Sequence, residues 1–196
     1  MFCTQFFVTL ASPKLLPFGN EIKKKFFCFA FRSLIRNFAA RMKERVLVTG
    51  ATGFIGSFIV EEGLKRGYEV WAAVRSSSSR KYLSDSRIHF VELDLSSTER
   101  LVEQLRGLDF DYVVHAAGVT KCADRQDFFR VNTEGTAHLV EALQRAGLHV
   151  KRLVYLSSLS IFGPIREEQP YTEITDADTP QPNTAYGRSK LQAEEL

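Results

Sequence analysis

The sequence predicts an α/β fold in which helices cover both faces of a doubly wound parallel sheet. Two observations support this prediction. From Arg45 onward, short β-branched runs alternate with longer segments of helical period, which is typical of parallel sheets. A glycine-rich segment also joins the first such run to the first helical segment. The expected strands span residues 45–49, 69–74, 88–93, 111–116 and 152–157.

Helices are expected between these strands. Each of the first three predicted helices is followed by a glycine, the residue that most readily ends a helix in the left-handed conformation. The three segments are Ile55 to Arg66 before Gly67, Ser97 to Arg106 before Gly107, and Phe128 to Arg145 before Gly147.

Residues 1–41 differ in composition from the rest of the chain. They contain nine of the 16 phenylalanines and seven Lys or Arg against one acid, Glu21. Met42 then leads directly into the first predicted strand. We therefore expect a leader or non-native upstream extension over 1–41 and a nucleotide-binding domain over 42–196. The alternative is a basic, phenylalanine-rich amphipathic helix over 23–41 that lies on a membrane or acts as a targeting peptide.

Charge and cysteine content narrow the function classes. The net charge of +3 comes from the leader, because residues 42–196 have 19 basic and 22 acidic residues, a balance that argues against nucleic acid as a partner. Cys3, Cys28 and Cys122 are widely separated and lack metal-ligand spacing, so we predict no metal site and a reduced, cytoplasmic setting. No apolar run is long enough for a transmembrane helix.

The glycine-rich segment predicts a dinucleotide-binding turn. Its pattern is Gly-x-x-Gly-x-x-Gly, and glycines here let the backbone turn sharply and approach a pyrophosphate at the start of the following helix. The position between a strand and a helix makes the pattern informative and indicates a Rossmann-like fold. The predicted cofactor-binding residues of this segment are Gly50, Thr52, Gly53, Phe54, Ile55 and Gly56.

The end of the second strand bears on the choice of cofactor. An acidic residue there would bind a free ribose 2′-hydroxyl, whereas arginine suits a 2′-phosphate. The strand is followed by Arg75, with serines and Arg80 behind it. The sequence therefore favours NADP over NAD, with an ordinary solvated arginine as the alternative.

Other strand ends complete the predicted cofactor site. Asp94 and Leu95 follow the third strand, where they would lie near the adenine, and Ala116, Ala117 and Gly118 follow the fourth, where small side chains leave room for a ring. His115 is expected to be a packed strand residue. Asp109 and Asp111 are expected in a solvated turn.

A tyrosine and a lysine near the C-terminus suggest acid/base chemistry. Tyr186 and Lys190 are four residues apart, so on a helix they share a face, and a neighbouring cation favours the phenolate form of a tyrosine. A surface pair on a helix is the alternative. The fifth strand ends in Tyr155-Leu156-Ser157-Ser158, which brings hydroxyls to the edge of the sheet where such folds bind ligands.

From Arg45 to Leu196 the chain resembles the extended short-chain dehydrogenase/reductases, the NAD-dependent epimerase/dehydratase family. The motifs that carry the resemblance are Thr49-Gly50-Ala51-Thr52-Gly53-Phe54-Ile55-Gly56, Asp94-Leu95, His115-Ala116-Ala117-Gly118, Val131-Asn132-Thr133-Glu134-Gly135-Thr136, the segment Leu156 to Gly163, and Tyr186-Gly187-Arg188-Ser189-Lys190.

The resemblance implies an NAD(P)-dependent oxidoreductase or epimerase. Tyr186 would exchange a proton with the substrate oxygen, Ser158 would bind the same oxygen, and Lys190 would assist Tyr186 and hold the nicotinamide ribose. Both Tyr186 and Lys190 would thus also contact the cofactor. Asn132 would join a water relay or pack the helix.

The resemblance also sets expectations about partners and extent. The substrate would be a sugar nucleotide or a small aldehyde or ketone, and a homodimer is one assembly open to the chain. Family members continue past the tyrosine helix, so we expect a fragment that lacks the C-terminal substrate region and leaves its fifth strand as an apolar edge. The acidic segment 164–182 is expected to be a mobile loop. The alternative function is a non-catalytic dinucleotide-binding redox sensor or scaffold module.

Overall fold

The computed structural model describes residues 43–164, 173–175 and 177–196. The predicted leader over 1–41 and half of the predicted acidic loop lie outside the described residues, so both stay predictions. The sheet and its helices belong to the unit Lys43–Leu196.

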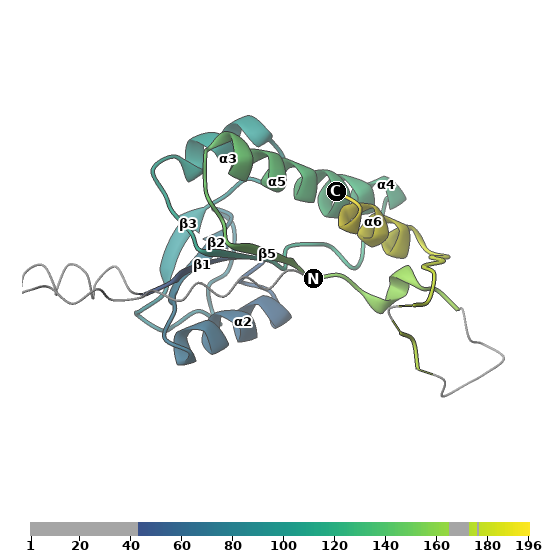
Figure 1. The fold of residues 1–196 in the computed structure, drawn as a ribbon, viewed down its shortest axis with the longest axis horizontal. Helices are drawn as coiled ribbons and strands as arrows, with labels where there is room; N and C mark the ends of the chain where they lie inside the picture. Colours follow the sequence, from purple (N-terminus) through teal and green to yellow (C-terminus); the bar gives the residue numbers. More distant parts are fainter. Residues whose placement is uncertain (1–42, 165–172, 176) are drawn as a thin grey trace, which may run out of the picture. The chain divides into compact units, whose positions relative to one another are not determined.

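Five parallel strands form one sheet in the order β3-β2-β1-β4-β5 (Figure 1). The predicted doubly wound α/β fold is confirmed, and the observed strands match the predicted ones to within two residues at each end. They are β1 (Arg45–Thr49), β2 (Glu69–Val74), β3 (His89–Glu92), β4 (Tyr112–His115) and β5 (Arg152–Tyr155).

Helices cover both faces of the sheet. Helix α2 lies on one face, and α3 and α5 lie on the other together with α4 and α6 (Figure 1). The bounds are α2 (Phe54–Lys65), α3 (Thr98–Leu105), α4 (Arg125–Phe128), the π-helical segment η1 (Phe129–Glu134), α5 (Gly135–Arg145), the short 3₁₀ helix η2 (Leu159–Ile161) and α6 (Ala185–Glu194).

Strand β1 buries side chains on both of its faces because each face meets helices. Along β1, Val46 and Val48 contribute to the apolar cluster that includes Val60 and Leu64 of α2, whereas Leu47 contributes to the cluster that includes Leu101 of α3. Alternate side chains of a strand point to opposite faces, so one short run supplies both cores. Both clusters hold β1 at the centre of the sheet.

The structure tests where three of the predicted helices end and where one of them begins. Gly67, Gly107 and Gly147 all have positive φ, at 86°, 77° and 70°, which confirms them as left-handed residues after a helix. The helix predicted over 128–145 begins earlier, at Arg125, and contains the π-helical segment η1. A π-helical turn adds a residue to the helical repeat, and such turns are frequent at functional sites.

Strand β5 is at the edge of the five-stranded sheet. Its Leu153 and Val154 side chains are 36% and 47% exposed, as expected for an apolar edge. Within the described residues, no helix has the length and hydrophobicity needed to cross a membrane.

Candidate functional site

The glycine turn after β1 is packed against the segment after β4. Gly50 has φ +65°, and a Cβ atom on it would lie 2.6 Å from backbone atoms of Ala116 and Ala117. A Cβ atom on Gly56 would lie 2.1 Å from the Gly50 carbonyl oxygen. Both positions therefore require glycine, and the first turn of α2 lies directly on the glycine turn.

The start of α2 presents backbone N–H groups. Gly53 is its N-cap, and among the described residues no side chain caps this helix and no acid occupies its first turn. By contrast, side chains of Ser97, Asp124 and Thr184 cap α3, α4 and α6. An uncapped helix start favours an anion through its free N–H groups and the helix dipole.

The remaining predicted residues of this turn differ in exposure. Thr52 is half-buried, whereas the Phe54 and Ile55 side chains are 79% and 51% exposed. The side chains of Phe54 and Phe58 pack edge to face, with ring centroids 5.3 Å apart. The side chains of residues 54 and 55 are therefore open to solvent at the start of α2.

A buried hydrogen-bond network lies behind the glycine turn. Thr49 Oγ1 is 2.6 Å from His115 Nδ1, and the Ala117 N–H donates to the same hydroxyl oxygen at 3.3 Å. On the other side of the ring, His115 Nε2 is 3.0 Å from Thr136 Oγ1. The network thus joins the end of β1, the end of β4 and the start of α5.

The network fixes the state of the His115 ring. Thr136 donates its hydroxyl proton to the Asn132 carbonyl oxygen at 2.6 Å, so it must accept from His115 Nε2–H, and Nδ1 must accept from the Thr49 hydroxyl. Burial, reinforced by the Lys190 charge, lowers the His115 pKa to about 4. The ring is therefore neutral and structural, as predicted for a packed strand residue.

Asn132, in η1, extends the network to α6. Its side-chain oxygen accepts from Val119 N–H at 2.8 Å, and its amide nitrogen donates to the Val119 carbonyl oxygen at 3.1 Å and to Ser189 Oγ at 3.0 Å. Ser189 Oγ in turn donates to the Tyr186 carbonyl oxygen at 2.8 Å. Of the two roles left open for Asn132, these bonds favour packing of the helices.

Lys190 lies inside this assembly. It is 4% exposed, its ammonium donates to the Leu156 carbonyl oxygen at 2.7 Å, and it lies 4.0 Å from the centroid of the Tyr155 ring. A Cβ atom on Gly118 would be 4.0 Å from the Lys190 nitrogen and 3.0 Å from Asn132 Oδ1. Burial lowers the Lys190 pKa to about 8.

The start of α6 is packed against the serine-containing segment after β5. A Cβ atom on Gly187 would lie 2.3 Å from the Ser160 carbonyl oxygen. Ser158 caps η2 by accepting from the Ser160 N–H at 3.2 Å, and the Tyr186 ring lies 5.8 Å from that of Phe128. The fold thus brings the helix that carries Tyr186 and Lys190 to the segment that carries Ser158.

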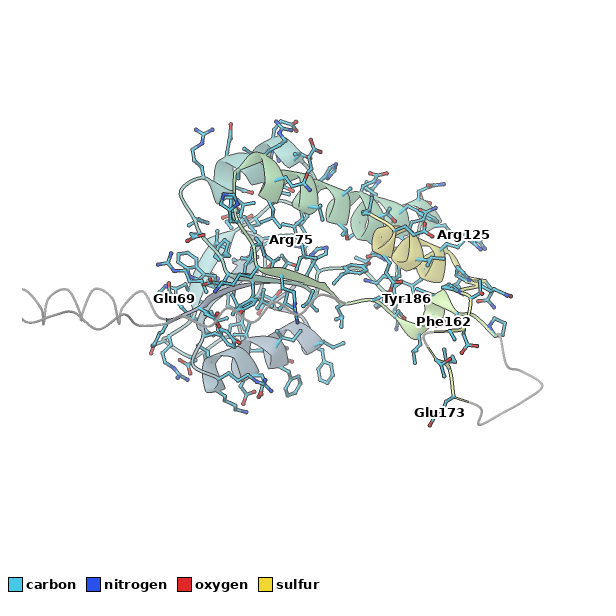
Figure 2. All side chains as sticks on the ribbon, viewed as in Figure 1. Glu69, Arg75, Arg125, Phe162, Glu173 and Tyr186 are labelled. Carbon is cyan, nitrogen blue, oxygen red and sulfur yellow. The ribbon has the colours of Figure 1, made fainter. Side chains whose placement is uncertain are left out.

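The residues predicted near the adenosine lie after β2 and β3. Glu69 marks the amino end of β2, and both Arg75 and Tyr186 lie to its right in Figure 2, toward the carboxyl ends of the strands. Arg75 is exposed, and its backbone N–H donates a hydrogen bond to Ser78 Oγ at 3.1 Å. The Arg80 guanidinium lies 4.4 Å from the Phe90 ring centroid, so Arg75 is the better candidate for a phosphate.

Asp94 and Leu95 are already engaged within the protein. The Asp94 carboxylate accepts from Ser96 and from Arg100, which lowers its pKa to about 2. The Leu95 carbonyl oxygen is 2.9 Å from His138 Nδ1. These contacts hold the loop after β3 in place.

The assembled residues fit a nicotinamide dinucleotide. The uncapped start of α2 suits a pyrophosphate, the side-chain-free Gly118 adjoins the Lys190 ammonium, and Arg75 is exposed at the end of β2. Within the described ranges, no three His, Cys, Asp or Glu side chains gather as metal ligands would.

The sequence assigned no specific role to four residues that build this site, namely Thr49, Thr136, Tyr155 and Ser189. Thr49, Thr136 and Ser189 lie within the motifs that carry the resemblance, which was the available signal. The Tyr155 hydroxyl was expected at the carboxyl edge of the sheet, but nothing in its spacing indicated a contact between its ring and Lys190.

Residues 46–196 match the model of the NAD dependent epimerase/dehydratase family. The chain is 33% identical to a putative dihydroflavonol 4-reductase from Synechocystis sp., in an alignment that covers 79% of the chain and 44% of the relative. It is 31% identical to the UDP-glucose 4-epimerase of Bos taurus, with 79% and 48% covered. The chain therefore spans about half the length of these relatives.

Solved structures with a similar fold also match this chain over about half of their own length. The UDP-Glc/GlcNAc 4-epimerase from Campylobacter jejuni superposes with a TM-score of 0.67 at 26% identity, covering 78% of this chain and 47% of that one. The Bordetella bronchiseptica enzyme WbmG, solved in complex with NAD, superposes with a TM-score of 0.65 at 27% identity, covering 78% and 48%.

Proposed function

Because the chain belongs to the NAD dependent epimerase/dehydratase family, we propose that it carries the cofactor-binding and acid/base groups of an NAD(P)-dependent oxidoreductase or epimerase. One observation supports this most directly. The glycine turn touches Ala116 and Ala117, the adjoining Gly118 lies against Lys190, and Lys190 binds the carbonyl of Leu156, two residues before Ser158. These contacts join the segments that carry the proposed phosphate and ribose groups, and they bring Lys190 to the segment that carries Ser158, which supports the proposal.

The proposed roles follow from this arrangement. A bound nicotinamide would supply the hydride acceptor or donor. The start of α2 binds the pyrophosphate, and Lys190 holds the adjacent ribose. Tyr186 gives a proton to, or takes one from, the substrate oxygen, and Ser158 donates a hydrogen bond to the same oxygen. The protein's part is thus positioning and proton transfer.

The substrate class follows from the relatives. Relatives and structural neighbours include UDP-sugar epimerases and a putative dihydroflavonol 4-reductase, so we propose a sugar nucleotide or a small carbonyl compound. The alternative is a dinucleotide-binding module without turnover, acting as a redox sensor or scaffold. A reduced, cytoplasmic setting also remains part of the proposal.

The acid/base role is tested by Tyr186→Phe. Nucleotide binding would be followed by NADH and NADPH fluorescence, and net hydride transfer to aldehydes and ketones by nicotinamide absorbance. Epimerisation returns the hydride to the same substrate, so with UDP-sugars the product sugar would be analysed instead. We expect unchanged binding and a rate lowered about 10²- to 10⁴-fold, the usual worth of a positioned acid or base. Tyr82→Phe, the same change at a 61% exposed tyrosine, is the control and should leave the rate unchanged.

The outcomes separate the two functions. Binding with a rate that depends on Tyr186 supports the enzyme. In a version of the protein that spans the length of its relatives, binding with neither net hydride transfer nor interconversion of the UDP-sugars overturns the enzymatic proposal and favours the binding module. Absence of binding by both nucleotides overturns both.

The cofactor preference is tested by Arg75→Ala. We propose NADPH as the preferred nucleotide because an exposed guanidinium at this strand end suits a 2′-phosphate. The substitution should weaken NADPH binding about 10- to 100-fold and leave NADH binding unchanged, since one charge-assisted hydrogen bond is worth roughly 1.5–3 kcal/mol. Arg106→Ala, at an exposed arginine after α3, is the control. Tighter NADH binding that Arg75→Ala leaves unaltered would show that NAD is the cofactor.

A further inference from the structure

The Lys190 ammonium is buried beside few groups that can stabilise its charge. The residue is 4% exposed, and among the described residues no carboxylate forms an ion pair with it. Its contacts are the Leu156 carbonyl oxygen at 2.7 Å and the Tyr155 ring at 4.0 Å. Burying a charge is costly. Glu194, four residues later on α6, favours the charged form of Lys190 without contacting it, so the two contacting groups must replace part of its hydration.

The face of an aromatic ring can supply part of that compensation. A cation within about 6 Å of a ring centroid is attracted by the quadrupole, and more strongly when it is desolvated. At 4.0 Å, the Lys190–Tyr155 pair is well within this range. The Tyr155 ring is itself fixed, because it stacks on His115 with centroids 5.7 Å apart and an interplanar angle of 28°.

The Tyr155 hydroxyl contributes little to the arrangement. It is buried, and among the described residues it forms no hydrogen bond of regular geometry. The neighbouring Thr136 hydroxyl interacts with it but is already committed to Asn132 and His115. An unpartnered buried hydroxyl costs stability. The ring of this residue, rather than its phenol, is therefore the part that the site uses.

The position of the Lys190 ammonium also brings it next to the segment that follows β4. With one N–H on Leu156 and the ring on another side, the ammonium also adjoins Gly118, where an added Cβ atom would lie only 4.0 Å from its nitrogen. Gly118 belongs to the Ala116–Gly118 segment that packs on the glycine turn.

From these contacts we propose that Tyr155 is a positioning residue, whose ring face holds the Lys190 ammonium between Leu156 and Gly118 at the dinucleotide site. The proposal rests on the proposed function for the identity of the ligand, but the geometry it asserts can be measured without one. In this proposal a residue of β5 fixes the position of a side chain of α6. Loss of the ring should release the ammonium, whereas loss of the hydroxyl should not.

The experiment uses the full chain with ¹³C,¹⁵N-labelled lysine. In the unaltered protein, the protons next to the Lys190 nitrogen should be shifted upfield by the ring current, with the signal assigned through Lys190→Arg. Tyr155→Phe should keep this shift, and Tyr155→Leu should abolish it. Tyr155→Met, which refills the space without a ring, provides the same comparison if the leucine variant does not fold.

Nucleotide affinity is the second readout. We expect Tyr155→Phe to bind the preferred nucleotide within twofold of the unaltered chain, and Tyr155→Leu or Tyr155→Met to bind it about tenfold more weakly. The control is Tyr82→Leu, because Lys81 lies 4.5 Å from the exposed Tyr82 ring. Its removal should change the Lys81 signal and leave nucleotide affinity unaltered.

The results distinguish the positioning role from the proposed function. If neither NADH nor NADPH binds the unaltered chain, the proposed function fails, while the Lys190 shift still tests the geometry. An unshifted Lys190 signal overturns the positioning role, as does affinity in the folded ringless variants equal to that of Tyr155→Phe. An upfield signal that Tyr155→Phe keeps, together with weaker binding in the ringless variants alone, supports it.

Discussion

Different kinds of polar contact hold the two ends of the strands, called here the amino edge, where the parallel strands start, and the carboxyl edge, where they finish. At the amino edge, exposed charges connect the strand starts. Lys151 pairs with Glu44 at 3.0 Å and with Asp111 at 2.8 Å, and Arg45 pairs with Glu69 at 3.2 Å. At the carboxyl edge, buried neutral hydrogen bonds centred on His115 and Asn132 predominate, beside the buried Lys190 ammonium and the Asp94–Arg100 pair.

This difference shows where the fold tolerates change. Exposed ion pairs contribute little to stability and are screened by salt, so the amino edge can lose a member without losing its geometry. A buried polar group that loses its partner costs far more. The carboxyl edge, where we place the nucleotide, therefore holds its geometry more strictly than the amino edge does.

The largest expected effect comes from Gly56→Ala at the carboxyl edge. Its Cβ atom would lie 2.1 Å from the Gly50 carbonyl oxygen, and a backbone atom cannot move aside as a side chain can. We expect a loss of about 4 kcal/mol in the free energy of unfolding, at the upper end of overpacking effects, measured by urea denaturation. Nucleotide affinity should fall at least tenfold in the protein that remains folded.

Gly63→Ala is the matched control in the same helix. Its Cβ atom would meet side-chain atoms of Val70 at 3.0 Å and of Val46 at 3.8 Å, and alanine is the better helix former by about 1 kcal/mol. The cost should therefore be much smaller. Equal destabilisation by the two substitutions would contradict the strict geometry assigned to the glycine turn.

Acid should weaken the carboxyl edge before the amino edge. Burial lowers the His115 pKa from 6.5 to about 4, so between these values the unfolded chain binds a proton that the folded chain does not. The stabilisation is present above pH 6.5 and is lost as the pH falls toward 4, by about 3 kcal/mol at roughly 1.4 kcal/mol per pH unit. At the amino edge, the pKa of Asp111 is lowered by Lys151, so its contribution is lost only below pH 3.8.

Urea denaturation between pH 7 and 4.5 measures this slope. His149→Gln, at an exposed histidine, should keep the slope of the unaltered chain. His115→Gln should remove it at a cost in stability. A free energy of unfolding that stays constant from pH 6.5 to 4.5 would show that His115 is not held in its neutral form.

The sequence predicted the sheet and the residues at its carboxyl edge with little error. Period and β-branched content located all five strands, and the glycines after three helices marked their ends, because both signals are local. The positions of Gly50, Lys190 and Ser158 followed from motifs, and the structure brings their segments into contact. The roles proposed for these residues stay predictions.

What the sequence did not predict depends on long-range contacts. Helical spacing placed Tyr186 and Lys190 on one face, but it could not show that the ammonium binds the Leu156 carbonyl oxygen, 34 residues away. The π-helical turn around Asn132 adds a residue that a period of 3.6 does not reveal. Asp111 was expected in a solvated turn, and it instead accepts from the Arg45 N–H at 2.8 Å and pairs with Lys151.

The smallest expected effect comes from Lys151→Met, which removes both pairs of that lysine at the amino edge. The side chains of Lys151, Glu44 and Asp111 are 55%, 41% and 30% exposed. Water therefore replaces most of the interaction energy that the two ion pairs supply. We expect the melting temperature to fall by less than about 3 °C, with a smaller difference in 1 M NaCl because salt screens the pairs. Nucleotide affinity should not change, because the lysine precedes β5 and the proposed site follows it. A loss of stability as large as that of Gly56→Ala, or weaker nucleotide binding, would show that the two edges are coupled and that the amino edge also sets the geometry of the site.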